Sequence, residues 1–139
     1  VDINKISIVG HSMGGHMALA GILDNPNVSC AVTFDGANMG KGLLNDPAST
    51  NLWSDYSDQL FMLNDWSGKK MVAEISEHGE GLDLVKRVDT INGRPVFIIV
   101  ADTDVIPMKT QIVPLVTALK ATKNSNVSYL LIDDDHSFS

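Results

Sequence analysis

Four short runs of apolar residues punctuate the chain, and each is bounded by turn-forming residues. They cover residues 5–9, 28–34, 95–101 and 127–132. Near-continuous runs of this kind are typical of strands that are covered on both faces. Helical segments separate the strands, so the alternation predicts a parallel sheet of about four strands, flanked by helices, with right-handed crossovers. We therefore expect an α/β fold.

Two connecting segments have clear helical patterns. Residues 13–23 are rich in apolar positions, and Pro26 with its Asn and Asp neighbours stops the helix. Residues 109–123 place Ile, Leu and Val side chains on one side of a helix. Pro114 must lie in the first turn of that helix or kink it.

The chain changes character between residues 39 and 93. Half of its eight aromatic residues lie in this window, and short helices are predicted around residues 54–63, 69–77 and 81–89. We interpret residues 39–93 as a helical insert between two core strands. Its aromatic residues could line an apolar pocket, or they could form a small core of the insert itself.

A glycine-rich turn links the first apolar run to the first helix. Its sequence, Gly10-His11-Ser12-Met13-Gly14, fits G-x-S-x-G, a pattern that acquires meaning in a strand–turn–helix context. Such a sharp turn calls for small residues at positions 10 and 14, and Gly15 would let the helix pack close to the strand. Ser12 would then expose its hydroxyl at the tip, where the N–H groups of the new helix point. The alternative is an incidental serine in a glycine-rich turn.

This turn resembles the nucleophile elbow of the α/β-hydrolase family. Residues 1–6 resemble the lead-in to the elbow strand in esterases, dienelactone hydrolases and prolyl-oligopeptidase-type members. The resemblance implies a serine hydrolase with a cap or lid at residues 39–93. In that family several strands precede the elbow strand. Residues 1–139 are therefore expected to be the C-terminal part of a partial α/β-hydrolase fold, with the N-terminal part of the same fold as its partner.

A serine nucleophile needs a base, and the base needs a partner that fixes its tautomer. His136 follows the last predicted strand, at the carboxyl edge of the sheet where Ser12 also lies. Residues 135–138 resemble the catalytic-histidine loop of the family. We expect His11 and His16 to pack against neighbouring elements, away from the serine, and His78 to lie in a solvated turn.

The acid has three candidates. Asp104 and Asp102 follow the third strand, where the family usually places its acid. The family's pattern favours Asp104, but the spacing to Pro107 is about one residue short, which leaves Asp102 open. Asp35 follows the second strand, where some members of the family carry the acid; it could equally form a turn.

The order Ser12, Asp104, His136 is the order expected of this fold. Stabilising the oxyanion requires two N–H donors, and the backbone N–H of Met13 would be one of them. The resemblance implies that the second donor comes from a loop that precedes Val1. Residues 1–139 alone are therefore expected to show weak activity or none.

The composition narrows the choice of partners. The net charge of −7 argues against nucleic acid and mildly against anionic membranes, and no apolar run approaches a membrane span. The single cysteine, Cys30, cannot form an internal disulfide and is expected to be a buried apolar residue, which slightly favours a cytoplasmic location. An acidic rim could attract calcium or magnesium, but a solvated turn is the simpler interpretation, so we assign no metal and no cofactor. The residues of that rim are Asp102, Asp104, Asp133, Asp134, Asp135 and His136.

The sequence thus predicts a serine hydrolase that cleaves a carboxylic ester, or a related acyl bond of a small molecule, through an acyl-enzyme. A peptidase or thioesterase with the same triad is the first alternative. A catalytically silent binding module with the hydrolase fold is the second.

Overall fold

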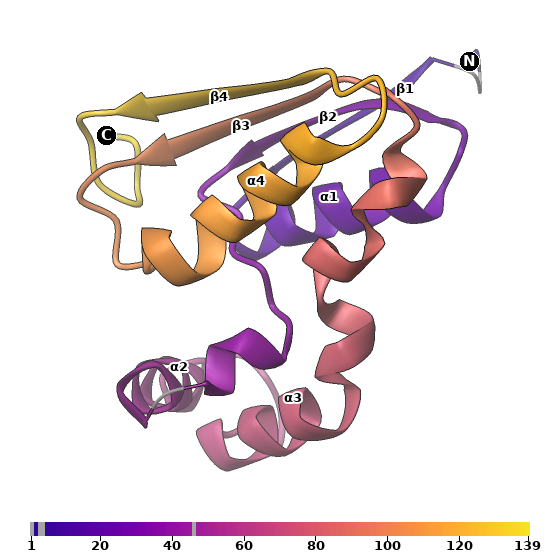
Figure 1. Cartoon of the computed structure of the whole chain (residues 1–139). Coiled ribbons are helices and arrows are strands. Elements are labelled where there is room, and N and C mark those ends of the chain that lie inside the picture. The colour runs from indigo at the N-terminus through magenta and orange to yellow at the C-terminus, as the bar shows by residue number, and fades with distance from the viewer. Residues whose placement is uncertain (1, 3–4, 46) are drawn as a thin grey trace. The chain divides into compact units, whose positions relative to one another are not determined.

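A computed structural model describes residues 2, 5–45 and 47–139 (Figure 1). The chain divides into two compact units, which we describe separately. Unit 1 consists of Val1–Asn38 and Leu84–Ser139, and unit 2 consists of Met39–Asp83. Among the described residues, no helix is long and apolar enough to cross a membrane.

Unit 1 is built on a four-stranded parallel sheet in the order β1-β2-β3-β4 (Figure 1). Each apolar run of the sequence supplies one strand, and the first strand continues to the residue before Ser12. The strands are β1 (Ile6–His11), β2 (Val28–Phe34), β3 (Val96–Ala101) and β4 (Val127–Ile132). Because all strands are parallel, their carboxyl ends meet at one edge, where the loops after β1, β2, β3 and β4 gather.

The helices of unit 1 lie on one side of this sheet (Figure 1). They are α1 (Met13–Asp24), the 3₁₀ helix η2 (Leu84–Ile91) and α4 (Val113–Ala121). Leu19, Ile22, Leu115 and Leu119 on α1 and α4 are at most 2% exposed and form the core with the inner side chains of the strands. Each such burial contributes about 1.5–3 kcal/mol, so this layer holds the strand ends in place.

The segment before α4 differs from the expected single helix over residues 109–123. A short π-helix, η3 (Met108–Ile112), comes first, and α4 then begins with Pro114 in its first turn. Proline is favoured there because the N–H that it lacks would have no acceptor within the first turn of a helix. Of the two placements expected for Pro114, the first turn of the helix is therefore the one observed.

The other face of the sheet carries no helix among the residues described for unit 1. Val9 on β1 is 64% exposed and Leu130 on β4 is 44% exposed. Cys30 is only half-buried on β2, and its thiol donates a hydrogen bond to the hydroxyl of Ser7 (3.1 Å). The expectation that every strand is covered on both faces, and the expectation of a buried cysteine, are therefore wrong for the described residues. Apolar runs look the same whether one face or both are covered.

Unit 2 consists of the 3₁₀ helix η1 (Lys41–Leu44) and the helices α2 (Pro47–Asp58) and α3 (Gly68–Leu82). It has a small core of its own, formed by Leu43, Met71 and Ile75 with Trp53 packed against it. The side chain of Ser67 caps α3 by accepting the N–H of Lys70 (3.3 Å). Trp53 thus packs within the insert.

The helix boundaries in this region differ from those predicted. Helix α2 begins earlier, at Pro47, and ends at Asp58, whereas the sequence predicted residues 54–63. Helix α3 continues through two glycines to Leu82, so His78 lies within a helix rather than in a turn, although it is exposed as expected. Unit 2 ends at Asp83, before the residue 93 that was expected to end the insert, because η2 packs in unit 1.

Candidate active site

Ser12 lies at the sharp turn between β1 and α1. Its backbone has φ 56° and ψ −121°, an unusual conformation for a non-glycine residue that costs about 1–3 kcal/mol. Three hydrogen bonds hold it there. Its N–H donates to the carbonyl of Phe34 (2.8 Å), and its own carbonyl accepts the N–H groups of Gly15 (3.0 Å) and His16 (3.2 Å). The strand before Ser12 and the helix after it therefore fix where its side chain begins.

The glycines around the turn differ in how much space a side chain would have at each position. A Cβ at Gly10 would lie 1.9 Å from the carbonyl oxygen of Gly14, and a Cβ at Gly15 would lie 2.8 Å from the Cα of Gly36. The loop after β2 thus touches the start of α1 backbone to backbone. At Gly14 a Cβ would meet nothing within 4 Å, so the expected need for a small residue at that position is wrong.

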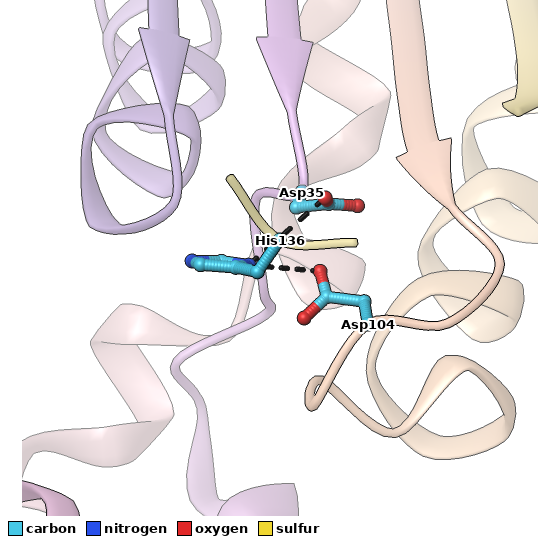
Figure 2. Close-up of side chains that lie close together, drawn as sticks. All are labelled: Asp35, Asp104 and His136. Atoms are coloured by element: carbon cyan, nitrogen blue, oxygen red, sulfur yellow. Dashed lines mark hydrogen bonds and ion pairs between the residues drawn. The ribbon is translucent and has the colours of Figure 1, made fainter. Parts of the chain in front are cut away.

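The imidazole of His136 connects Ser12 to Asp104. Its Nε2 lies 2.9 Å from Oγ of Ser12. Its Nδ1 lies 2.9 Å from Oδ2 of Asp104 (Figure 2). An ionised carboxylate can only accept, so Nδ1 carries the proton and Nε2 is free to accept the hydroxyl proton of Ser12. The other oxygen of Asp104 accepts the N–H of Ile106 (2.9 Å), which holds the carboxylate in this orientation. The side chains of Ser12, His136 and Asp104 therefore form one continuous hydrogen-bonded chain.

The loop that carries His136 is held by its own acidic residues. The carbonyl of Asp134 accepts both the N–H (3.2 Å) and the hydroxyl (2.5 Å) of Thr103. The side chain of Asp135 accepts the N–H of Ser137 (2.8 Å). The acidic run after β4 therefore forms a turn attached to the loop after β3, in agreement with the simpler interpretation of these residues.

His11 is a residue of the site that sequence reasoning missed. Its Nε2 lies 2.7 Å from the carbonyl oxygen of His136 and donates to it, and the two ring centroids are 4.8 Å apart. Phe138 packs edge-on against His11 (5.8 Å) and Phe34 (5.5 Å). His11 thus packs against a neighbouring element, as expected, but that element is the loop that carries His136. Its position directly before Ser12 was the available signal.

His16, by contrast, packs inside unit 1 as expected. Its side chain is 3% exposed, and Nδ1 donates to the carbonyl of Ala37 (3.1 Å). Burial lowers the pKa of this imidazole, which therefore stays neutral around pH 7. We assign it a packing role.

The three candidates for the acid lie in different surroundings. Asp104 bonds to His136, whereas Asp102 is exposed and uses its backbone N–H to donate to the carbonyl of Ile132 (2.9 Å). Asp35 is fully buried, and its Oδ2 lies 4.0 Å from Nδ1 of His136 (Figure 2). The structure thus brings Asp104 and Asp35 to the imidazole, and leaves Asp102 outside.

Asp35 occupies an unusual position. Its backbone φ is 45°, and its Oδ1 accepts the N–H of Ala101 (2.9 Å). Its Oδ2 is buried and has no hydrogen-bond partner among the described residues. Burial raises the pKa of this carboxyl group to about 7; the Ala101 N–H opposes the rise, and nearby Asp104 adds to it.

A metal ion could in principle be held by a group of three side chains among the described residues, those of Asp35, Asp104 and His136. One possible ligand atom from each lies within 4.8 Å of the other two. The His136 N–H already lies between the ring and Asp104, so a cation there would have to break that hydrogen bond. The arrangement is therefore that of a carboxylate–imidazole pair. None of Asp102, Asp133, Asp134 and Asp135 belongs to this group.

Met13 is the first residue of α1, directly after Ser12. The first N–H groups of a helix have no acceptor within the helix, so they remain available to a group bound at Ser12. The side chain of Met13 is 53% exposed. Its role as an oxyanion donor stays a prediction.

Comparison with known proteins identifies the fold. No family model matches the chain, and neither does any curated protein. Solved structures do match nearly all of it. A 2,6-dihydroxy-pseudo-oxynicotine hydrolase is 17% identical over 98% of this chain and 35% of its own, with a TM-score of 0.65. A puromycin-hydrolyzing peptidase from Mycobacterium tuberculosis is 18% identical over 99% of this chain and 19% of its own, with a TM-score of 0.68.

The esterase domain of a Rhodothermus marinus protein is 21% identical over 96% of this chain and 51% of its own, with a TM-score of 0.60. The chain thus spans from about a fifth to about half of the length of these three structures. All are α/β-hydrolase-fold proteins. The chain has a partial α/β-hydrolase fold, as its sequence predicted.

Proposed function

We propose that the protein is a serine hydrolase that cleaves acyl bonds, with Ser12 as nucleophile, His136 as base and Asp104 as the acid. The observation that carries this proposal is the continuous pair of 2.9 Å hydrogen bonds through the imidazole of His136. The strained backbone of Ser12 adds support, because strain of this kind concentrates at functional sites. The similar solved structures, a hydrolase, a peptidase and an esterase domain, agree with the proposed class.

The reaction begins when the hydroxyl of Ser12 attacks an acyl carbonyl carbon and its proton passes to Nε2 of His136. The carbonyl oxygen becomes an oxyanion, which the N–H of Met13 would stabilise by about 3 kcal/mol. His136 then returns the proton to the leaving oxygen or nitrogen as the carbonyl re-forms. Water repeats these steps against the acyl-enzyme. Throughout, Asp104 accepts the Nδ1–H and offsets the positive charge on the ring.

A carboxylic ester is the proposed substrate class, and a peptide or thioester is the alternative because the same triad cleaves these bonds. The esterase and peptidase neighbours match the chain about equally well, so they do not favour either class. Comparing kcat/KM for an ester and an amide of one acyl group decides between the two. We further propose that residues 39–93, which include unit 2, form a lid over the substrate.

The test is hydrolysis of p-nitrophenyl acetate by the protein in its native length. We expect Ser12→Ala to lower kcat at least about 10³-fold, because the nucleophile is removed. Ser7→Ala is the matched control, since this serine is exposed on β1 and takes no part in the triad. Equal rates for the Ser12→Ala variant and the unmodified protein would refute the proposal and favour a silent binding module.

A further inference from the structure

Two carboxyl groups face one imidazole nitrogen in this site. Asp104 lies in the loop after β3, and its Oδ2 is 2.9 Å from Nδ1 of His136. Asp35 follows β2, and its Oδ2 is 4.0 Å from the same nitrogen (Figure 2). The Asp35 side chain is 0% exposed and that of Asp104 is 2% exposed. A triad needs one acid, so the second buried carboxyl requires an explanation.

The surroundings distinguish the two groups. The ionised form of Asp104 is stabilised at both oxygens, by the Nδ1–H of His136 and the N–H of Ile106. Asp35 receives one donor, the Ala101 N–H at Oδ1, and its buried Oδ2 has no partner among the described residues. Two adjacent carboxylates cannot both ionise cheaply away from water, so the proton stays on the group that is less well satisfied.

We propose that Asp35 is a positioning residue of the triad: its neutral carboxyl group directs an O–H at Asp104, and it becomes the partner of His136 when Asp104 is neutralised. This inference rests on the proposed function for its catalytic consequence. With Asp35 neutral, the cluster carries one negative charge in the resting state. It becomes neutral overall when His136 takes the proton of Ser12, because the imidazolium and the Asp104 carboxylate then balance each other. The net charge of the cluster therefore never exceeds one.

The groups that face Asp35 are consistent with this role. From the neighbouring loops these are Asp104, which opposes its ionisation, and His136, which favours ionisation when it is charged. On β4, burial raises the pKa of Tyr129, and the negative charge of an ionised Asp35 adds to that rise. Because an acidic neighbour and burial outweigh the single N–H donor, Asp35 remains protonated up to about neutral pH.

The first test is a double-mutant cycle with Asp35→Asn, Asp104→Asn and both together, read out as kcat/KM for an activated ester. Asparagine keeps the acceptor for Ala101 and places an N–H donor where the O–H would be. We therefore expect Asp35→Asn alone to change the rate less than about 3-fold. In the Asp104→Asn background the same change should cost at least about 10-fold, because it removes the remaining carboxylate.

A purely structural role for Asp35 predicts the same factor in both backgrounds, and that result would overturn the proposal. Asp102→Asn is the matched control, since this exposed aspartate should have no effect in either background. Thermal unfolding of each variant shows whether a loss of rate reflects a loss of fold.

The second test does not depend on activity. Carbon-13 NMR of aspartate-labelled protein at pH 6 should show one protonated carboxyl that is absent in Asp35→Asn. The absence of that signal from the unmodified protein would overturn the proposal. A protein that shows this signal but neither hydrolyses esters nor reacts with a fluorophosphonate at Ser12 would instead refute the proposed function. The protonated carboxyl of Asp35 would then stand without it.

Discussion

The position of one proton on His136 depends on four other residues, which come from three places in the chain. Asp104 fixes the proton on Nδ1, and Ser12 faces the free Nε2. His11 donates a hydrogen bond to the backbone carbonyl of His136, and the buried carboxyl group of Asp35 lies 4.0 Å from Nδ1. The motif and the strand ends predicted that Ser12 and His136 lie at the same edge of the sheet. The resemblance to the family favoured Asp104 among three candidates for the acid. His11 contacts His136 across 125 residues and Asp35 accepts the N–H of Ala101 across 66, so these contacts leave no local pattern.

We expect His11→Leu to lower kcat by roughly 5- to 10-fold. The substitution removes the hydrogen bond to the His136 carbonyl, which contributes about 1 kcal/mol to holding the loop. Steady-state hydrolysis of an activated ester measures the effect. His78→Leu, on the exposed surface of α3, is the control and should leave kcat unchanged. Equal effects of the two substitutions would show that His11 does not position the loop.

Asp35 should make stability depend on pH. Its folded pKa of about 7 lies above the ordinary value of 3.8, so its contribution is fully present below about pH 3.8 and is lost as the pH rises through 7. Between pH 4 and pH 8, the free energy of unfolding of the unmodified protein should fall by roughly 4 kcal/mol relative to that of Asp35→Asn. Urea unfolding of both proteins across this range measures the difference.

The contribution of His16 has the opposite sign. Its folded pKa lies below 6.5, so its contribution is present above pH 6.5 and is lost as the pH falls. His16 is present in both proteins, and its effect cancels in the difference. A difference in stability that does not change with pH would mean that Asp35 is not held protonated.

At the scale of elements, the strands were easier to predict than the helices of the insert. Each strand is a compact apolar run, and neighbouring runs pair in sequence order. Helix α2 was misplaced because residues 47–53 are mostly Ala, Ser, Thr and Asn, which carry little periodicity. The close approach of Gly15 to Gly36 depends on how α1 packs against β2, which a local pattern does not encode.

The turn that carries Ser12 should be intolerant of Gly10→Ala and tolerant of Gly14→Ala. A methyl group at position 10 would overlap the carbonyl of Gly14, so the turn must move, at a cost of at least about 1–3 kcal/mol. At position 14 a methyl group has open space and replaces a helical glycine, which should be neutral or stabilising by up to about 1 kcal/mol. Thermal unfolding and ester hydrolysis of both variants test this pair; similar losses in both would contradict the packing argument.

At the scale of the whole molecule, the chain combines a sheet-based unit that holds Ser12, Asp104 and His136 with a helical unit that has its own core. The two ends of unit 1 that flank unit 2 are joined, since the N–H of Leu84 donates to Oδ1 of Asn38 (2.9 Å). Unit 1 therefore closes on itself without unit 2. The sequence changes character at residue 39, where unit 2 begins, whereas the end of unit 2 at Asp83 depends on η2 packing in unit 1.

Replacing residues 39–83 with a short Gly-Ser linker should leave unit 1 folded and Ser12 reactive. The flanking residues are already within hydrogen-bond distance, so the linker has little distance to span. The proposed lid predicts a changed preference between short and long acyl esters. Circular dichroism and ester hydrolysis across chain lengths measure both effects. Loss of the fold of unit 1 would show that the units are not independent, and an unchanged acyl preference would remove the lid.

The central claim is that the hydroxyl of Ser12 is activated by His136, and reaction with a fluorophosphonate tests it most directly. Mass spectrometry of the protein in its native length should show one phosphonyl group on the peptide that contains Ser12. Ser12→Ala should abolish the modification, and His136→Ala should slow it by about 10³-fold or more. An unmodified Ser12, or labelling that is equally fast without His136, would contradict the account.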